Sequence, residues 1–294
     1  MGDIFKAILG GIIQGLTEFL PVSSSGHLAI FNNLFNFGFD DAILFTLILH
    51  LGTLTAVVIA YFSDIKALII GFLQLIVRIF TGKFKYSRLS TGERFAILVF
   101  IASVPLVVGA LIDKQIEFLT ERTKIIGVFL IVNAVILFLS DRIKTDRKDR
   151  TDRTDRTDKT VKARKITEKN ATPIQALLVG LWQLIGVPPG LSRSGMTITG
   201  GLVNGFSRTF AVKFSFIMSI PAILGASVFK FADVAKNGAE ITGTMIASCI
   251  VGFIFAFIFG LFAIILLRMI VKSKKFYIFS IYCFIVGLIA IIFG

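Results

Sequence analysis

The sequence predicts an all-α membrane protein with several transmembrane helices, arranged as an inverted repeat. Of its 294 residues, 55% are hydrophobic, the mean hydropathy is +0.86, and 31 Phe accompany a single Trp. One soluble core cannot hide that much apolar surface, whereas bilayer-spanning helices of about 20 residues can. The net charge of +13 does not indicate nucleic-acid binding, because the basic residues lie between the apolar runs, as in cytoplasmic loops.

Six apolar runs are long enough to be predicted as full spans, at about 42–62, 95–112, 125–140, 210–229, 242–268 and 276–293. Two further segments, 4–37 and 174–206, are interrupted by prolines and polar residues, and each is predicted to be a re-entrant helical hairpin. Residues 65–80 are apolar but carry charges, so we interpret them as an interfacial helix. No small-residue cleavage site follows the first apolar run, so we expect no cleavable signal.

Residues 141–170 are predicted to form a disordered cytoplasmic loop. They contain a Thr-Asp-Arg repeat and almost no apolar residue, so they cannot bury a core. Their excess of Lys and Arg places them on the cytoplasmic side of the membrane. This loop separates a first half, 1–140, from a second half, 171–294.

The two halves match when the sequence is compared with itself at an offset of 169 residues. Three predicted spans separate the two hairpins, and an odd number reverses orientation, so we expect inverted repeats. The basic segments then lie on one side and both termini outside. Broken helices at membrane depth need protein or water to satisfy the freed backbone, so the hairpins should meet near the midplane. The matched pairs include Gln14 with Gln183, Ser23 with Ser192, Ser25 with Ser194 and Gly26 with Gly195.

The first hairpin carries polar side chains in the stretch QGLTEFLPVSSSGH, residues 14–27. Gln14 and Glu18 share a helix face, Pro21 ends that helix, and serines suited to an N-cap follow. A new helix N-terminus there would offer free N–H groups to an anion. Ser24 and His27 are three residues apart, within reach on one turn. A capped hairpin with a pore-facing Glu and His is the alternative interpretation.

The second hairpin carries PPGLSRSGMT, residues 188–197, and the repeat places Arg193 opposite Ser24. An arginine at membrane depth is rarely left unpaired, and its guanidinium fork suits phosphate oxygens. Together the hairpins predict one shared anion site. The alternative is an ion pair between Arg193 and Glu18 that holds the repeats together.

Three other polar residues are interpreted as structural. His50 lies inside an apolar span, where we expect it to bond a helix carbonyl. Cys249 and Cys283 also lie in apolar runs and define neither a disulfide framework nor a metal site.

The paired motifs resemble those of the undecaprenyl-diphosphate phosphatase family, also called bacitracin-resistance proteins. The resemblance rests on Gln14-xxx-Glu18, PVSSSGH at 21–27 and PGLSRSGMT at 189–197, and it extends over the chain in length, span count and repeat layout. It implies hydrolysis of undecaprenyl diphosphate to the monophosphate in the bacterial cytoplasmic membrane, which recycles the lipid carrier for peptidoglycan synthesis. It also implies an active site open to the outer face and dependence on a divalent cation.

The resemblance implies that Ser24 is the nucleophile, that His27 and Glu18 are catalytic, and that Arg193 binds phosphate. We expect His27, oriented by Glu18, to take the serine proton as base and later to serve the water that hydrolyses the phosphoserine. Because the motif begins with Gln14, Glu18 is its one carboxylate, and Mg²⁺ or Ca²⁺ would rely on Glu18, substrate phosphate and water. The Thr-Asp-Arg insert departs from the family pattern. Further predicted substrate contacts are Gln14, Ser23, Ser25, Ser192, Ser194 and Thr197.

A transporter or flippase for a phosphate-bearing anion is the alternative function, because inverted repeats with broken helices at the midplane occur in secondary transporters. An ion channel is disfavoured, since the sequence has no ring-like run of pore carbonyls or carboxylates. Transport needs an anion site but no nucleophile beside a base, so Ser24, Glu18 and His27 favour the enzyme. Membrane lipids are expected partners, nucleic acid is not, and an oligomer remains open.

Overall fold

The computed structural model describes residues 2–35, 42–111, 116, 118–143, 166–237, 242–273 and 275–294. Within these ranges the chain is helical, apart from an isolated bridge between Ile166 and Phe206. The first half contains α1 (Gly2–Phe19), α2 (Ser24–Phe35), α3 (Ala42–Ala60), α4 (Phe62–Phe80), η1 (Tyr86–Arg88), α5 (Thr91–Ser103), α6 (Pro105–Leu111), η2 (Phe118–Glu121) and α8 (Thr123–Asp141). The second half contains α9 (Pro173–Ile185), α10 (Arg193–Val203), α11 (Arg208–Asn237), α12 (Gly243–Lys272) and α13 (Tyr277–Phe293).

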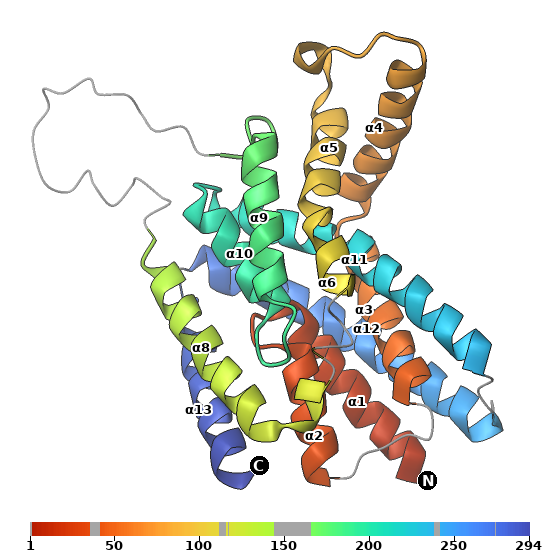
Figure 1. The fold of residues 1–294 in the computed structure, drawn as a ribbon, viewed down its shortest axis with the longest axis vertical. Coiled ribbons are helices and arrows are strands. Elements are labelled where there is room, and N and C mark those ends of the chain that lie inside the picture. The colour runs from red at the N-terminus through yellow and green to blue at the C-terminus, as the bar shows by residue number, and fades with distance from the viewer. Residues whose placement is uncertain are drawn as a thin grey trace, which may run out of the picture.

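Two helical hairpins enter the molecule from opposite ends and meet at its centre (Figure 1). In that view α1 rises to the centre and α2 returns downward, whereas α9 descends to the centre and α10 returns upward. This opposed arrangement is the one that an inverted repeat requires. The exact limits of the two repeats stay a prediction.

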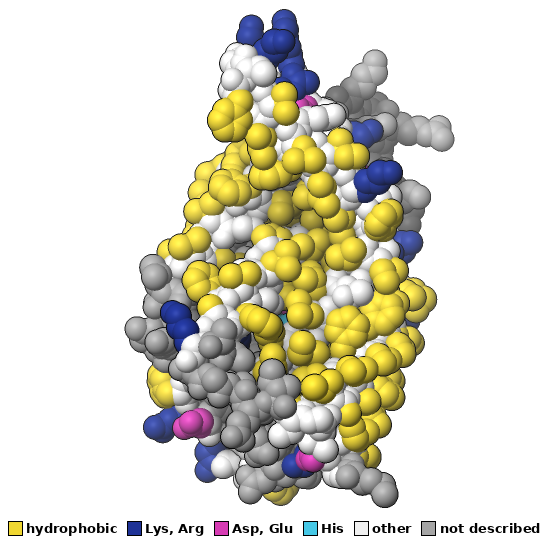
Figure 2. Space-filling model, turned by 90° about the vertical axis from the view of Figure 1, so that its right-hand side faces the viewer, with side chains coloured by type: hydrophobic (Ala, Val, Ile, Leu, Met, Phe, Trp, Pro, Cys, Tyr) yellow, Lys and Arg dark blue, Asp and Glu magenta, His cyan; other side chains and the backbone are white. Residues whose placement is uncertain are grey.

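Apolar side chains cover much of the outer surface, as Figure 2 shows for one face. Ile254, Phe262, Phe284 and Phe293 are each more than 40% exposed on α12 and α13, and similar residues cover other helices. A soluble protein rarely exposes so large a contiguous apolar surface, because it would associate in water. The described helices therefore form a multi-pass membrane protein.

Four described segments are long and apolar enough to cross a bilayer: Thr91–Gly109, Thr123–Asp141, Arg208–Ala232 and Gly243–Lys272. They correspond to four of the six predicted spans. The predicted span at 42–62 becomes α3, which bends by 90° into α4. The predicted span at 276–293 becomes α13, a helix of only 17 residues. The count of six full spans therefore stays a prediction.

The bend between α3 and α4 is stabilised by Arg268 of α12. Its guanidinium donates to the carbonyl of Ala60 (3.1 Å) and to the hydroxyl of Tyr61 (3.1 Å), and it lies 4.1 Å from the Tyr61 ring centroid. The carbonyl that the broken helix frees thus gains a charged donor. Beyond the bend, α4 runs beside α5 as a protruding hairpin (Figure 1), joined by an ion pair of Arg78 with buried Glu93. The interfacial position predicted for 65–80 stays a prediction.

Helix α1 is held tightly against α12 by small residues. A methyl group on Gly11 or Gly15 would lie less than 3 Å from the carbonyl oxygen of Gly252 or Ala256. Such close approach between backbones is the usual way that helices associate in lipid, where packing replaces the hydrophobic effect. The register of α1, and with it the position of its polar end, is therefore set by α12.

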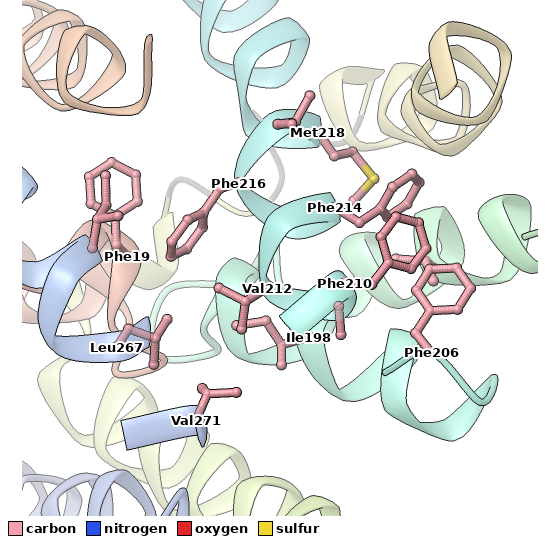
Figure 3. Close-up of a cluster of buried hydrophobic side chains, with 14 of the residues drawn as sticks. Phe19, Ile198, Phe206, Phe210, Val212, Phe214, Phe216, Met218, Leu267 and Val271 are labelled. Carbon is pink, nitrogen blue, oxygen red and sulfur yellow. The ribbon is translucent and has the colours of Figure 1, made fainter. Parts of the chain in front are cut away.

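An aromatic cluster anchors the second hairpin and α11 (Figure 3). The rings of Phe206, Phe210 and Phe214 lie 4.7 to 5.7 Å apart, and Phe216 packs edge-on against Phe19 of α1 at 5.2 Å. Each of these rings is at most 3% exposed, so each contributes a large buried apolar area. The cluster joins elements of both halves behind the hairpin tips.

The loop predicted at 141–170 is partly structured. Residues 144–165, which hold the Thr-Asp-Arg repeat, lie outside the described residues. At one end, Asp141 closes α8 and accepts a hydrogen bond from Arg208 (2.9 Å), and at the other end Glu168 pairs with Lys213 (3.0 Å). Charged partners on α11, distant in sequence, thus bind both ends of the predicted loop, and the prediction of disorder stays a prediction.

Candidate active site

The tip of the first hairpin is a tight turn between α1 and α2. Pro21 lies in this turn, and the amide of Val22 donates to the carbonyl of Leu20 (2.7 Å). Ser23 then adopts a left-handed backbone with φ of 72°, which is uncommon for a residue other than glycine. Its side chain accepts the amide of Gly26 (3.2 Å) and caps α2. The turn thus starts α2 at Ser24, beside the end of α1.

The tip of the second hairpin is a longer turn between α9 and α10. Gly190 needs its positive φ of 99°, and a methyl group there would lie 2.6 Å from the carbonyl oxygen of Ile126. Ser192 caps α10 by accepting the amide of Gly195 (3.1 Å). Arg193 is therefore the first residue of its helix, in the place that the repeat comparison assigned opposite Ser24.

The two tips contact each other directly and through Asn133 of α8. The amide of Gly190 donates to the Ser23 hydroxyl (3.0 Å), and the Ser194 hydroxyl donates to the carbonyl of Leu20 (3.2 Å). Buried Asn133 donates to the carbonyl of Pro21 (2.9 Å) and accepts the amide of Ser192 (3.2 Å). One amide side chain thereby satisfies a backbone group in each turn, as buried polar groups require.

Glu18 is the centre of the polar network at the tips, with a side chain only 3% exposed. Its Oε2 atom accepts the Ser24 hydroxyl (2.7 Å) and the Gln14 amide (2.9 Å), while Oε1 pairs with the Arg193 guanidinium. Three donors, one of them charged, offset the cost of burying a carboxylate. The ion pair of the alternative interpretation is therefore present, and the same carboxylate joins Ser24 to Arg193, whereas anion binding at this place stays a prediction.

A cavity of about 240 Å³ opens beside this network. Both hairpin tips contribute to its wall, together with parts of α3, α6 and α11. The first turns of α2 and α10 lie at its edge, so two helix N-termini offer partial positive charge there. Its polar lining includes Glu18, Ser24, His50, Gln183, Arg193 and Lys230.

The structure places His27 away from this cavity, of whose described lining it is not a part. Its Nδ1 atom lies 2.8 Å from the carbonyl oxygen of Ser23, and its Nε2 atom lies 2.8 Å from the hydroxyl of Tyr282. The two rings are stacked, with centroids 5.5 Å apart. Both nitrogens therefore have partners in the turn and in α13. The predicted role of base stays a prediction that this arrangement does not favour.

The other predicted contacts divide into two groups. Ser23, Ser25 and Ser192 line the cavity with Ser24 and Arg193. Ser194 and Thr197 instead stabilise the tip: the Ser194 hydroxyl bonds Ser192 (3.1 Å), and the Thr197 hydroxyl lies 2.6 Å from Ser215 of α11. Gln14 contacts the site through Glu18.

Sequence reasoning missed four residues of the site. His50 was interpreted as a helix-bonded histidine, and it does bond the carbonyl of Thr46, but its other nitrogen faces Glu18. Gln183 served only as a repeat match, and Lys230 and Asn133 were not considered. An ionisable residue within a span is a functional candidate by default, and that rule would have found His50.

The described residues do not form a cage for a divalent cation. No group of three His, Cys, Asp or Glu side chains gathers anywhere in the described part of the chain. At the cavity, both oxygens of Glu18 already accept hydrogen bonds or pair with Arg193. A cation would take most of its ligands from phosphate oxygens and water.

Comparison with known proteins places this arrangement in a family. The family described as bacitracin resistance protein BacA matches residues 7–289. This chain belongs to that family. Among its relatives, the undecaprenyl-diphosphatase of Alkaliphilus metalliredigens is 39% identical over 293 residues, covering 99% of this chain and 98% of the relative. The protein of the same name from Methanosphaera stadtmanae is 37% identical, covering 99% of this chain and 98% of the relative. That from Thermosipho africanus is 35% identical, covering 98% of this chain and 99% of the relative. The BacA family match therefore includes both hairpin tips and every residue of the site.

Proposed function

We propose that this chain hydrolyses undecaprenyl diphosphate to undecaprenyl phosphate and phosphate. The reaction recycles the lipid carrier for cell-wall synthesis and supports resistance to bacitracin, as the names of the family and its relatives suggest. The observation that carries the proposal is the hydrogen bond of the Ser24 hydroxyl to Glu18, in the same cavity as Arg193. In this proposal Ser24 is the nucleophile, Glu18 accepts its proton and the Arg193 guanidinium binds phosphate. All three side chains line the same cavity.

In the proposed mechanism, the Ser24 oxygen attacks the terminal phosphorus of the diphosphate. Glu18 accepts the serine proton, since its Oε2 atom lies 2.7 Å from the hydroxyl. The bond from phosphorus to the bridging oxygen breaks, and undecaprenyl phosphate leaves. Water then hydrolyses the phosphoserine and restores the enzyme.

Arg193 and the two helix N-termini bind the phosphates in this proposal. A guanidinium has five N–H donors, so Arg193 can hold phosphate oxygens while one nitrogen stays with Glu18. Phosphoryl transfer depends mainly on such positioning and charge stabilisation. Glu18, phosphate oxygens and water would hold a Mg²⁺ or Ca²⁺ ion, which would neutralise charge on the diphosphate, so a chelator should lower activity.

We further propose that the cavity opens to the outer face of the cytoplasmic membrane and that the basic loop is cytoplasmic. Arg208, at the start of α11, pairs with Asp141 next to that loop. Lys230 at the cavity lies 22 residues further along α11, about 33 Å at the helical rise per residue. The cavity rim and the basic loop therefore lie toward opposite ends of α11. Trypsin should cut within 144–165 in inverted membrane vesicles and not in intact spheroplasts.

Phosphate release by the purified protein in detergent tests the function. We expect the unmodified chain to release phosphate from undecaprenyl diphosphate and Ser24→Ala to lose at least a thousandfold in kcat, because the nucleophile is missing. Near-normal turnover by Ser24→Ala would exclude Ser24 as the nucleophile. Absence of release by the unmodified, folded chain would favour the transporter or flippase, which needs two compartments to act.

A further inference from the structure

His50 lies on α3, outside both hairpin motifs, and its ring orientation is defined. The Nδ1 atom is 2.8 Å from the carbonyl oxygen of Thr46, one turn earlier in the helix. A carbonyl can only accept, so Nδ1 carries the hydrogen and the neutral ring has its lone pair on Nε2. That lone pair is the group that can take up a proton.

The Nε2 atom of His50 faces the centre of the site. It lies 3.8 Å from Oε2 of Glu18, the same oxygen that accepts the Ser24 hydroxyl. The separation is too long for a direct hydrogen bond, and both groups line the cavity, where a water molecule can lie beside them. The His50 side chain lines the cavity and is 31% exposed, so water can reach it. His27, by comparison, uses both ring nitrogens outside the cavity.

Hydrolysis of a phosphoserine needs two proton transfers at once. The attacking water loses a proton as its oxygen bonds phosphorus, and the serine oxygen gains a proton as its bond to phosphorus breaks. After the first step Glu18 holds the proton that came from Ser24, and it lies beside the serine oxygen that needs it. Glu18 cannot then accept a second proton from the water, so the proton must pass to a phosphate oxygen or to a second base at the cavity.

We propose that His50 is the base that deprotonates the water that hydrolyses the phosphoserine. This inference rests on the proposed function and assigns a step within it. The water oxygen forms a bond to phosphorus, its proton passes to Nε2 of His50, the bond from phosphorus to the Ser24 oxygen breaks, and Glu18 returns the proton to that oxygen. The phosphate product or solvent water then takes the proton from His50.

The test follows the terminal phosphate by rapid acid quench, with undecaprenyl diphosphate labelled in that phosphate. For His50→Gln we expect a burst of one undecaprenyl phosphate per protein, label retained on the protein at Ser24, and steady-state turnover lowered at least a hundredfold. The unmodified chain should retain little label. Thr55→Val is the matched control on α3, since that hydroxyl bonds the Leu51 carbonyl of its own helix and does not line the cavity. It should turn over normally.

A second variant keeps the proposal testable if His50→Gln does not fold. Turnover of His50→Ala should recover in part with added imidazole, and the recovery should increase with pH as free imidazole becomes neutral. The charged groups that act on this position are Glu18, Arg193 and Lys230, and all three remain in the variant.

The proposal is overturned if His50→Gln turns over at the normal rate, or if turnover falls with neither burst nor retained label. Imidazole that fails to restore folded His50→Ala would also overturn it. These outcomes are separate from failure of the proposed function, which would show as no phosphate release by the unmodified chain.

Discussion

The two hairpin tips have the same helix-capping arrangement but differ in the functional side chain that follows the cap. Ser23 and Ser192 occupy matched positions and each caps the next helix through the amide three residues on, at 3.2 and 3.1 Å. At the next position the first tip has the hydroxyl of Ser24 and the second has the guanidinium of Arg193. The repeat thus provides two equivalent helix N-termini at one cavity, and the tips differ at a single matched position, which is the basis of the proposed division into a reacting tip and a binding tip.

Among the tests of the difference between the two tips, the largest effect is expected at Arg193, which the proposal assigns to phosphate binding. Arg193→Lys should lower kcat/KM about a hundredfold, because a point charge replaces the fork that holds Glu18 and phosphate together. Steady-state kinetics in detergent measure it. Arg208→Lys is the matched control, since Arg208 pairs with Asp141 and does not line the cavity. Equal losses in the two variants would contradict the assignment of binding to the second tip.

The link between the tips should be sensitive to Asn133. Asn133→Ala leaves the Pro21 carbonyl and the Ser192 amide buried without this partner, and should lower the free energy of unfolding by about 3 kcal/mol. Thermal unfolding in detergent gives the measurement. Ser140→Ala, on the same helix, removes a hydroxyl that bonds the Leu137 carbonyl in its own helix and should cost less. If the two substitutions cost the same, Asn133 does not join the tips.

The two matched serines, Ser23 and Ser192, should contribute different amounts to the free energy of unfolding, although both cap a helix. Ser23→Ala should cost about 2 kcal/mol, because it removes the acceptor for two amides and leaves alanine in a left-handed conformation. Ser192→Ala should cost about 1 kcal/mol, the usual value of one cap at a φ of −91°. The unfolding midpoints of both variants give the measurement. A lower midpoint for Ser192→Ala than for Ser23→Ala would contradict this expectation.

An effect on stability as small as that of Ser192→Ala is expected at His27. His27→Gln should lower the free energy of unfolding by about 1 kcal/mol through loss of the contact with Tyr282, and should reduce turnover only by loosening the Ser23 turn. Acid-quenched samples should carry no excess phosphoserine. Accumulation of labelled serine in this variant would return the role of base to His27.

Helix breaks were predictable from the sequence because their causes are local. Pro21 and the Pro188-Pro189-Gly190 segment end their helices wherever the chain folds, so the expected hairpins agree with α1, α2, α9 and α10 within a few residues. The sequence also predicted a span that ends at about 62 and a separate helix at 65–80, but the 90° angle between them was not predictable, since no proline or glycine marks the bend. It depends on Arg268, more than two hundred residues away in the sequence.

The sequence predicted that Glu18, Ser24 and Arg193 lie together, but it did not predict where the two histidines lie. Glu18, Ser24 and Arg193 could be combined because the repeat offset relates the two motifs. His27 was expected beside Ser24 because three residues span one helical turn, yet Tyr282 of α13 binds its ring on another side. His50 lies in a span without any motif, and only the packing of α3 against the hairpin tips brings it within 3.8 Å of Glu18.

The size of the cavity has a consequence for substrate choice. About 240 Å³ is less than the roughly 300 Å³ or more of typical small-molecule pockets, so it can admit a diphosphate head group but not a long isoprenoid tail. The tail must stay among the lipid acyl chains while the reaction proceeds. A cavity of this size encloses the head group alone, so its wall has no means of sensing the length of the tail.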